Sequence, residues 1–395
     1  MKTCDVIGIS DSRKQWFPPE VMDAIRNGSV FSGGKRHHEI VASLLPAHTE
    51  WIDITVPLDK VFEQYEHYDH IVIFASGDPL FFGFANTVKR ECKGIKMRVF
   101  PSPNSLQMLA HRMCVAYHDM HVVSLTGRDW QKLDEALING EKMIGVLTDR
   151  TKTPHIIHQR MTEYGYTNYQ MTVGENLGNE EKERVRSYDK QAIYDHPNCI
   201  ILQKATERIR PFGVPDSDFA LLDGREKMIT KMPIRLLTLQ ALDLPKRKVF
   251  WDIGFCTGSV SIEARLQFPH LQIEAFEIRP ECEAIIQENA RRFGAPGINV
   301  HIGDFLETDI SALPHPDAVF IGGHGGRLKE VIAKVLTVLT DDGVIVMNSV
   351  KAPKVTTDSH QLWDEACQEL GLKQEMPTKI ILNENHPIEI LTCKR

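Results

Sequence analysis

Lys248-Val249-Phe250-Trp251-Asp252-Ile253-Gly254-Phe255-Cys256-Thr257-Gly258-Ser259-Val260-Ser261-Ile262-Glu263 is the stretch that decides the fold of the second half of the chain. An apolar run ends in Asp252-x-Gly254-x-x-x-Gly258, and a helical pattern begins directly after it. This order predicts a buried strand, a tight glycine loop and a helix whose first N–H groups face the loop. A helix start of this kind attracts anions, and glycines let a ligand approach the backbone closely. The glycine loop comprises Gly254, Phe255, Cys256, Thr257 and Gly258.

The spacing of the loop indicates which ligand to expect. A dinucleotide fingerprint requires glycine, glycine and glycine or alanine at positions one, three and six. Those positions hold Gly254, Cys256 and Ser259, so only the first requirement is met, and the loop instead resembles the cofactor loop of S-adenosylmethionine (SAM) methyltransferases. Glu277 closes the next expected strand roughly twenty residues on, where a carboxylate binds the ribose hydroxyls in such folds. A strand–turn–helix without a ligand is the alternative; Gly303-Asp304 after a third strand, 299–302, argues against it.

The composition is that of an ordinary globular protein with room for two or three domains. The chain has 395 residues, 42% of them hydrophobic and 25% charged. A net charge of −7 argues against nucleic acid as a partner. The eight cysteines form no C-x-x-C pair, and the histidine pairs at 118/121 and 155/158 lack other ligands, so we expect no metal. Without a signal peptide or an apolar run of about eighteen residues, the expected location is cytoplasmic, with no membrane partner.

The first half alternates strands, glycine-containing loops and helices, which predicts a mostly parallel sheet with a site at its strand ends. Strands are expected at 4–9, 70–75 and 96–100, and a helix from Pro18-Pro19 to Asn27. We expect Asp78 to cap the helix that follows Ser76-Gly77 and Pro79 to lie in its first turn. The glycine turn 32–38 is read either as a solvated turn or, slightly favoured, as a carboxylate-binding rim formed by Lys35 and Arg36.

Several segments of this half resemble the tetrapyrrole methylase family, in particular its cobalt-precorrin C5-methyltransferase branch. They are Ser76-Gly77-Asp78-Pro79-Leu80-Phe81-Phe82-Gly83, the turn Gly33 to His37, Ser102-Pro103-Asn104-Ser105, Ser124-Leu125-Thr126-Gly127-Arg128 and Glu175-Asn176-Leu177-Gly178. The resemblance implies two α/β lobes with SAM between them, and Gly77, Asp78 and Pro79 in its site. The second lobe would span about 99–202, with strands at 143–147, 170–174 and 199–202, a helix at 155–164 and an exposed hairpin tip or helix at 180–190. The sequence departs from the family in its first loop, where Gly8 alone remains of the expected glycines.

The second half resembles the cobalt-precorrin C15-methyltransferases (decarboxylating). The motifs are Pro-Asp-x-x-Phe at 215–219, Thr230-Lys231 with Arg235, the glycine loop, and Phe320-Ile321-Gly322-Gly323-His324-Gly325-Gly326. The resemblance implies SAM contacts from Thr230, the glycine loop, Glu277, Asp304 and Phe305. Cys256 stands where the family has a glycine, and Pro233 where it has an acidic residue. Beyond this region we expect a helix at 327–339, a strand at 344–347, a helix at 362–370 and an antiparallel strand pair, 379–382 and 389–392.

Together these resemblances imply an α/β chain with a two-lobed tetrapyrrole methylase domain, 1–204, and a Rossmann-like SAM-dependent methyltransferase domain, 227–395, joined by a linker, 205–226. Their order is that of the fused precorrin-6Y C5,15-methyltransferases (decarboxylating). The implied function is SAM-dependent methylation of a precorrin or cobalt-precorrin at C5 and C15, with loss of the C12 acetate carboxyl, in corrin-ring synthesis. The implied partners are a tetrapyrrole substrate and further copies of the chain.

The substrate carries several carboxylates, so each half needs cations or N–H donors at its mouth. Lys35, Arg36 and Arg128 are the candidates in the first half, and Lys231, Arg235 and His324 in the second, with Gly322 and Gly323 lining the approach. His324 is the catalytic candidate for decarboxylation, the alternative being a solvent-facing loop histidine. A different function, methylation of RNA or protein with the first half as a non-catalytic recognition or scaffold domain, would require a basic face.

Overall fold

The computed structural model describes residues 2–225, 227–350, 359–381 and 388–394. Contacts divide the chain into two compact units that interleave in sequence. The first comprises Met1–Arg128, Lys142–His158 and Tyr169–Ala205, and the second comprises Asp129–Glu141, Gln159–Asn168 and Thr206–Arg395. Among the described residues no helix is long and apolar enough to cross a membrane.

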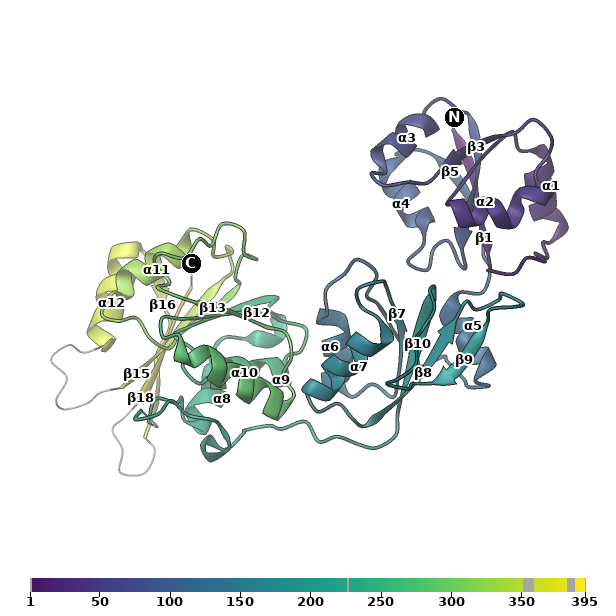
Figure 1. Cartoon of the computed structure of the whole chain (residues 1–395). Helices are drawn as coiled ribbons and strands as arrows, with labels where there is room; N and C mark the ends of the chain where they lie inside the picture. The colour runs from purple at the N-terminus through teal and green to yellow at the C-terminus, as the bar shows by residue number, and fades with distance from the viewer. Residues whose placement is uncertain (1, 226, 351–358, 382–387, 395) are drawn as a thin grey trace. The chain divides into compact units, whose positions relative to one another are not determined.

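The N-terminal lobe is built on a five-stranded parallel sheet with the order β3-β2-β4-β1-β5 (Figure 1), as the alternating pattern predicts. Side chains of successive strand residues point to opposite faces, so Val6 packs in one apolar cluster and Ile7 in another. The sheet is formed by β1 (Thr3–Ile9), β2 (Val30–Gly33), β3 (Glu50–Asp53), β4 (His70–Ser76) and β5 (Lys96–Phe100), with helices α1 (Pro19–Asn27), α2 (Lys35–Val41), the 3₁₀ turn Ala42–Leu44, α3 (Asp59–Tyr65) and α4 (Phe84–Glu91).

Two local expectations for this lobe are wrong. Asp78 does not cap a helix, because α4 begins only at Phe84 with Gly83 as its N-cap. The carboxylate of Asp78 instead accepts a hydrogen bond from the N–H of Leu80 at 2.9 Å and closes a turn. Residues 35–38 are not a glycine turn but the first turn of α2, which starts directly after Gly34.

The second lobe carries a mixed sheet with the order β6-β7-β10-β8-β9, in which only β6 and β7 run parallel. The expected strands and helix are present, whereas β6 and β9 were not predicted. The charged segment 180–190 contains β9, which forms a hairpin with β8, so the helical alternative is wrong there. The elements of this part of the chain are α5 (Ser105–Arg112), β6 (His121–Ser124), α6 (Gln131–Asn139), β7 (Met143–Leu147), α7 (Pro154–Glu163), β8 (Tyr169–Glu175), β9 (Arg184–Ser187) and β10 (Asn198–Lys204). Of these, α6 and the end of α7 belong to the second unit.

The C-terminal sheet has the order β13-β12-β11-β14-β15-β18-β16, with β17 also paired to β18. The first five strands are parallel, and β18 is antiparallel to β15. The strand order reverses between β11 and β14, and ligands bind at such reversal points, beyond the carboxyl ends of the strands. The strands are β11 (Val249–Ile253), β12 (Gln272–Glu277), β13 (Ile298–Ile302), β14 (Ala318–Ile321), β15 (Val344–Val350), β16 (Lys373–Gln374), β17 (Thr378–Ile380) and β18 (Ile388–Lys394).

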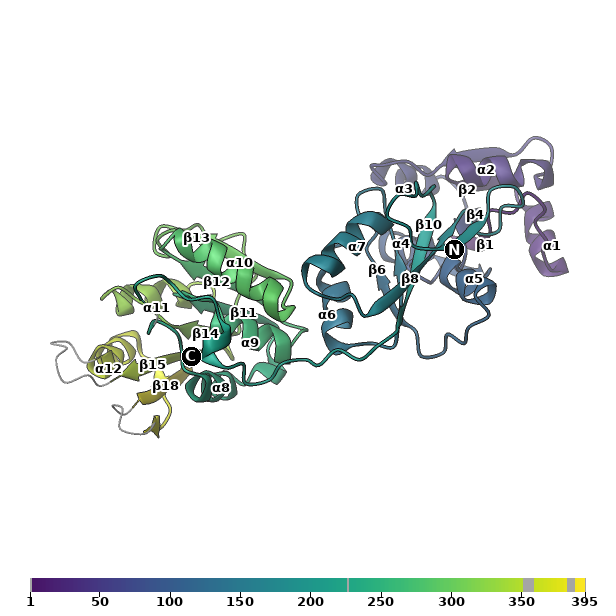
Figure 2. The same ribbon diagram turned by 60° about the horizontal axis from the view of Figure 1, so that its bottom comes forward.

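Helices cover both faces of this sheet, as Figures 1 and 2 show. Trp251 packs in the cluster that includes α11 and α12, and Phe250 packs on the opposite side with α8 and α9. The antiparallel pair expected at the end of the chain is present as β17 and β18, although Leu382 lies outside the described residues. The helices are α8 (Met232–Ala241), α9 (Ser259–Gln267), α10 (Glu281–Phe293), α11 (Leu328–Leu336) and α12 (Ser359–Leu370), with 3₁₀ turns Asp216–Asp218 and Leu244–Lys246.

Part of the expected linker packs against the second unit as a strap, residues 213–222. The N–H groups of Gly213 and Val214 donate to the buried carboxylate of Glu263 at 2.7 and 3.1 Å. The amide of Asn289 accepts from Ala220 N–H at 2.7 Å and donates to Ala220 O at 3.0 Å. The strap also buries three apolar side chains, those of Val214, Phe219 and Leu222. The domain limits 1–204 and 227–395 remain predictions.

The strap yields a prediction about domain fragments. Fully burying one apolar side chain contributes about 1.5–3 kcal/mol, and three such side chains belong to the strap. A fragment of residues 206–395 should therefore unfold at least about 10 °C higher than a fragment of residues 224–395. Both fragments lack the same N-terminal segments, so the comparison isolates the strap. Equal melting temperatures in calorimetry would show that residues 213–222 act only as a tether.

Candidate active sites in the two halves

The glycine loop after β11 packs directly against the loop after β14. Gly254 has a φ of 82°, and a Cβ added there would lie 2.6 Å from the backbone N of Gly323. Gly322 N–H donates to Ile253 O at 2.8 Å, which joins the two loops. At the end of the loop Gly258, with a φ of 73°, is the N-cap of α9. The predicted residues Gly254, Gly258, Gly322 and Gly323 are therefore brought together at one edge of the sheet.

Cys256 adopts the backbone conformation that a glycine would adopt. Its φ is 49°, in the left-handed region, where an L-residue costs roughly 1–2 kcal/mol. The side chain is buried, and burial raises the pKa of the thiol. The N–H of Cys256 donates to Glu277 Oε2 at 2.9 Å, so the strained backbone points a donor at the neighbouring strand end.

Glu277, at the carboxyl end of β12, is buried and fully hydrogen-bonded. Besides Cys256 N–H, its carboxylate accepts the N–H of Ile278 at 2.9 Å and the N–H of Arg279 at 3.2 Å. The guanidinium of Arg279 adds two bonds, from Nε at 2.9 Å and from Nη2 at 3.1 Å. The position of Glu277 beside the glycine loop is the one predicted, whereas Arg279 was missed, although its place two residues after the acid was visible in the sequence.

Two buried polar atoms at the loop have no hydrogen-bond partner among the described residues, Thr257 Oγ1 and Asp252 Oδ1. The other oxygen of Asp252 accepts from the N–H and the hydroxyl of Ser261, at 3.2 and 2.5 Å. Buried polar groups in native proteins are normally paired, so an orphaned hydroxyl in a glycine loop fits a polar ligand seated there. The unpaired atoms of Thr257 and Asp252 therefore fit polar groups of SAM, whereas protein donors already occupy the carboxylate of Glu277.

Asp304 follows β13 and is held by the loop after β14. Its carboxylate pairs with Arg327 and accepts the N–H of Leu306 at 3.0 Å, and Arg327 holds the pKa of Asp304 below its usual range. Phe305 is buried, with its ring edge-on to Phe276 at 5.1 Å. Asp304 is therefore tied to the loop after β14, and Phe305 belongs largely to the core.

His324 lies partly buried in the Gly322–Gly326 loop, and burial lowers the pKa of its imidazole. Its Nδ1 accepts the N–H of Gly326 at 3.2 Å. The ring proton of the neutral imidazole is therefore on Nε2, which can donate to a ligand. His324 is accordingly a neutral donor at pH 7, and not the fixed positive charge that a simple carboxylate anchor would supply.

The cations expected beside Thr230 are arranged differently from the prediction. Arg235 is fully buried, donating to Glu263 at 3.2 Å, to Thr230 O at 3.0 Å and to Val214 O. We expected Arg235 to bind a substrate carboxylate. Its guanidinium is instead buried and donates its hydrogen bonds within the protein, including one to Val214 in the strap. Lys231 is exposed, with Nζ 3.5 Å from Asp216. Thr230 is partly buried, and its carbonyl oxygen accepts the hydrogen bond from Arg235.

In the first unit, the Gly77-Asp78-Pro79 loop lies against the end of β1. A Cβ added to Gly8 would lie 2.0 Å from the carbonyl oxygen of Gly77, so the one remaining glycine of the first loop is required by packing. Gly77 itself has a φ of 62°. This close approach places the predicted residues 77–79 at the carboxyl ends of β1 and β4.

Arg36 and His37 both reach the residue that precedes this loop. Arg36 Nη2 donates to Ser76 Oγ at 3.0 Å, and His37 Nε2 lies 2.8 Å from the same oxygen. Burial, with the neighbouring Arg36, lowers the pKa of His37 to about 4, so the ring is neutral. Arg36 also pairs with Asp11 at 3.3 Å. Lys35 is exposed at the start of α2; His37 and Ser76 were not predicted.

Arg128, from the second lobe, meets the same loop. Its guanidinium lies 5.3 Å from the ring centre of Phe82 and donates to Ser124 Oγ at 2.8 Å. The structure therefore brings Arg36 and Arg128 to the two sides of the Ser76–Gly83 segment. A cation over an aromatic ring keeps part of its charge available to an anion.

The first loop, poor in glycine, is held by the segment after β8. Asn179 Nδ2 donates to Asp11 at 3.1 Å, and Glu180 accepts Ser12 Oγ at 2.5 Å and Arg13 N–H at 3.1 Å. The hydroxyl of Ser12 and the N–H of Arg13 lower the pKa of Glu180 to about 2. Side-chain hydrogen bonds thus fix the loop that follows β1.

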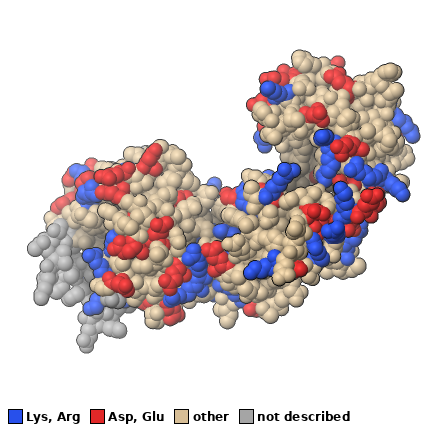
Figure 3. Space-filling view, in the orientation of Figure 1, with Lys and Arg blue, Asp and Glu red and all other residues tan. Residues whose placement is uncertain are grey.

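Charged side chains of both signs are mixed on the face shown in Figure 3. Near the candidate sites three arginines are already paired: Arg36 with Asp11, Arg279 with Glu277 and Arg327 with Asp304. An anionic ligand that binds any of these cations must compete with the carboxylate beside it. In the described parts of the chain, no three His, Cys, Asp or Glu side chains are placed to hold a metal ion.

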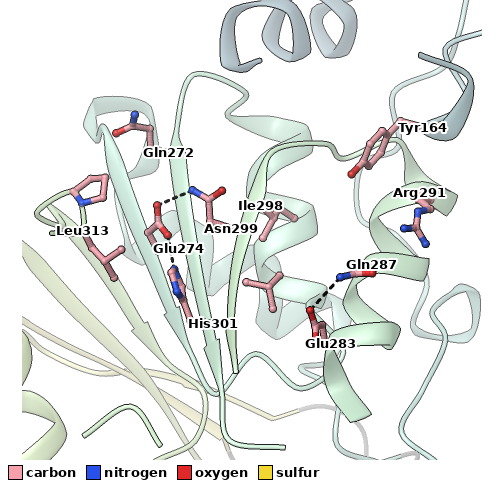
Figure 4. A pocket seen from close by; sticks show the side chains of 12 residues that line it. Tyr164, Gln272, Glu274, Glu283, Gln287, Arg291, Ile298, Asn299, His301 and Leu313 are labelled. Atoms are coloured by element: carbon pink, nitrogen blue, oxygen red, sulfur yellow. Dashed lines mark hydrogen bonds and ion pairs between the residues drawn. The ribbon is translucent and has the colours of Figure 1, made fainter. Parts of the chain in front are cut away.

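A cavity of about 730 Å³ lies elsewhere, beside the edge strand β13 (Figure 4). In it Glu274 accepts a hydrogen bond from Asn299 Nδ2 at 2.8 Å and lies 2.6 Å from His301 Nε2. None of the site residues predicted from the sequence is among the described residues that line this cavity. Glu274 is in the middle of β12, whereas the glycine loop follows the carboxyl end of β11, so the cavity is separate from the candidate site.

Comparison with known proteins gives a consistent assignment for both halves. Residues 1–190 match the family model of tetrapyrrole (corrin/porphyrin) methylases, and residues 223–378 match that of the precorrin methyltransferase domain. Precorrin-6Y C(5,15)-methyltransferase (decarboxylating) of Sinorhizobium sp is 33% identical over 355 residues, which are 87% of this chain and 84% of that protein. Cobalt-precorrin-6B C(15)-methyltransferase (decarboxylating) of Salmonella typhi is 32% identical over 185 residues, 45% of this chain and 95% of that protein. A solved structure, precorrin-6y C5,15-methyltransferase of Geobacter metallireducens, is 33% identical, with a TM-score of 0.41, and covers 47% of this chain and 98% of its own.

The environment of Asp252 leads to a pH prediction. Burial raises its pKa from 3.8 to about 7, against the opposing hydrogen bonds from Ser261. Because the folded-state pKa exceeds the unfolded value, this contribution to stability is complete below about pH 4 and is lost as the pH rises through 7. Asparagine has no charge to bury, so the melting temperature of Asp252→Asn relative to wild type should rise between about pH 5 and pH 8. A difference that stays constant over this range would contradict the raised pKa.

Proposed function

The chain belongs to the family of precorrin-6Y C(5,15)-methyltransferases (decarboxylating), and on that premise we propose that each half holds its own SAM site and performs one methyl transfer. The protein is a SAM-dependent methyltransferase of cobalamin biosynthesis that methylates a precorrin at C5 and C15 and decarboxylates it. We assign C5 to the first half and C15, with loss of the C12 acetate carboxyl, to the second.

The observation that carries this assignment is the convergence of three strand-end features in the second unit. The glycine loop after β11 donates a backbone N–H to the buried acid Glu277 at the end of β12, and a backbone hydrogen bond joins the end of β11 to the Gly322–Gly326 loop after β14. In the first unit the 77–79 loop, packed on Gly8 and flanked by Arg36 and Arg128, provides a second and separate position for a ligand. We place the two SAM molecules at these two positions.

In the second half, Glu277 and the glycine loop would hold SAM, which supplies a methyl group already activated by its sulfonium. Methyl transfer then requires mainly positioning and the exclusion of water from the reacting atoms. Gly325 and Gly326 leave space in this loop, since a Cβ at either position would meet no described atom within 4 Å. A large flat ring can therefore approach the backbone there.

We propose that His324 acts on the ring that decarboxylation leaves rich in electrons. Breaking the bond between the acetate methylene and its carboxyl carbon releases carbon dioxide and leaves the electron pair on the conjugated substrate. The Nε2–H of a neutral imidazole can donate a hydrogen bond to that developing charge. In the first half, Arg36 and Arg128 would orient substrate carboxylates, and exposed Lys35 would add charge at the rim.

Product mass spectrometry tests the proposed function. The full-length protein, given SAM and a precorrin-6-type substrate, should yield a product with two added methyl groups and one carbon dioxide lost. A product with one methyl group and no loss of carbon dioxide would show that the second half is inactive. A product that has lost carbon dioxide but gained one methyl group would show the same for the first half.

Substitution of His324 tests its role in the second half. A positioned proton or charge donor contributes about 10²–10⁴-fold, so His324→Ala should slow decarboxylating C15 methylation at least tenfold. C5 methylation and S-adenosylhomocysteine affinity should stay at wild-type values. His315→Ala is the matched control, because this exposed histidine precedes β14 at the opposite end of the strand. Wild-type C15 rates in folded His324→Ala would leave His324 without a catalytic role.

A further inference from the structure

The carboxylate of Glu277 has no acceptor position left for a ligand. Its Oε1 accepts the N–H of Ile278 and both the backbone N–H and Nε of Arg279, and its Oε2 accepts the N–H of Cys256 and Nη2 of Arg279. A carboxylate offers about four lone-pair positions, and five donors already share them. Ribose hydroxyls can therefore reach this carboxylate only if a present donor leaves.

The five donors differ in their freedom to leave. Three are backbone N–H groups, fixed by the glycine loop and by the end of β12. The other two belong to the guanidinium of Arg279, whose side chain is 23% exposed while that of Glu277 is 1% exposed. The arginine can turn into solvent on its flexible stem, whereas the carboxylate cannot. The only other described contact of its guanidinium, Nη1 to Met228 Sδ at 3.5 Å, is a weak one.

We propose that Arg279 is the resident counter-ion of Glu277 and sets the cofactor affinity of the second half by yielding its place to the ribose. This inference rests on the proposed SAM site at Glu277. Two guanidinium N–H donors leave and two hydroxyl donors arrive, so the number of hydrogen bonds on the carboxylate is conserved. Without the arginine the ligand-free protein would bury a charge with only backbone donors, which is costly. Arg279 thus stabilises the empty site and opposes its filling.

The proposal predicts opposite effects of one substitution on stability and on affinity. Arg279→Met removes the guanidinium and keeps an unbranched apolar side chain of similar reach. The ligand-free protein should melt at a lower temperature, while S-adenosylhomocysteine should bind the second half at least fivefold tighter in calorimetry of the full chain. Arg279→Lys keeps the charge with a single-point donor, so its affinity should lie between those of wild type and Arg279→Met. The site of the first half serves as an internal reference.

Controls separate this proposal from the proposed SAM site itself. Lys246→Met removes an exposed ion pair with Asp243, 2.9 Å long, in the same unit and should change neither quantity. Glu277→Gln should weaken S-adenosylhomocysteine binding on the order of tenfold, because it removes a charge-assisted bond. Unchanged affinity in Glu277→Gln would overturn the ribose contact and the proposal with it. If Glu277→Gln weakens binding but Arg279→Met binds no tighter than wild type, only the role of Arg279 is overturned.

Discussion

The buried carboxylate of Glu277 is the contact on which the second half depends. It ties the N–H of Cys256 in the glycine loop to the end of β12, and the same strand end receives the N–H of Gly303 from the next loop. Gly254, in turn, packs on Gly323 without room for a side chain. Four loops, each following a different parallel strand, are thereby fixed relative to one another. One buried charge, satisfied by backbone donors and one arginine, thus organises the proposed cofactor site.

A second buried ionic group anchors the chain that enters this domain. Glu263, on α9, accepts from Gly213, Val214 and Arg235, and all of these except the partly buried Gly213 are buried. Removing one partner of a buried pair leaves an uncompensated charge, which typically costs about 3–5 kcal/mol. Arg235 therefore has a structural role in holding the strap, and the strap brings the segment before Thr230 to the edge of the site.

The sequence predicted the elements with strong patterns and missed contacts set by tertiary structure. The glycine spacing and the apolar run of β11 identified the loop, the acid at Glu277 and the alternation of strands and helices. The burial of Arg235 was not predicted, because its position beside Thr230 does not reveal that Glu263 and the strap enclose it. β9 was missed because its exposed edge lacks an apolar run. The roles of Arg279, His37 and Ser76 depend on the hydrogen bonds that they form in the folded chain, and these bonds could not be predicted from the sequence.

The loops at the candidate sites are held by different kinds of interaction in the two halves. In the first half, side chains of Asn179 and Glu180 fix the loop after β1, and Arg36 and His37 hold the residue before the 77–79 loop. In the second half, backbone donors and glycines dominate. We propose that one chain carries two independent SAM sites, one in each half.

The number of cofactor molecules bound per chain tests this claim most directly. Equilibrium dialysis of the full-length protein against radiolabelled S-adenosylhomocysteine, with protein concentration fixed by amino-acid analysis, measures that number. The account predicts two molecules per chain at saturation. Saturation at one molecule per chain would contradict it and would make one half a scaffold for the other.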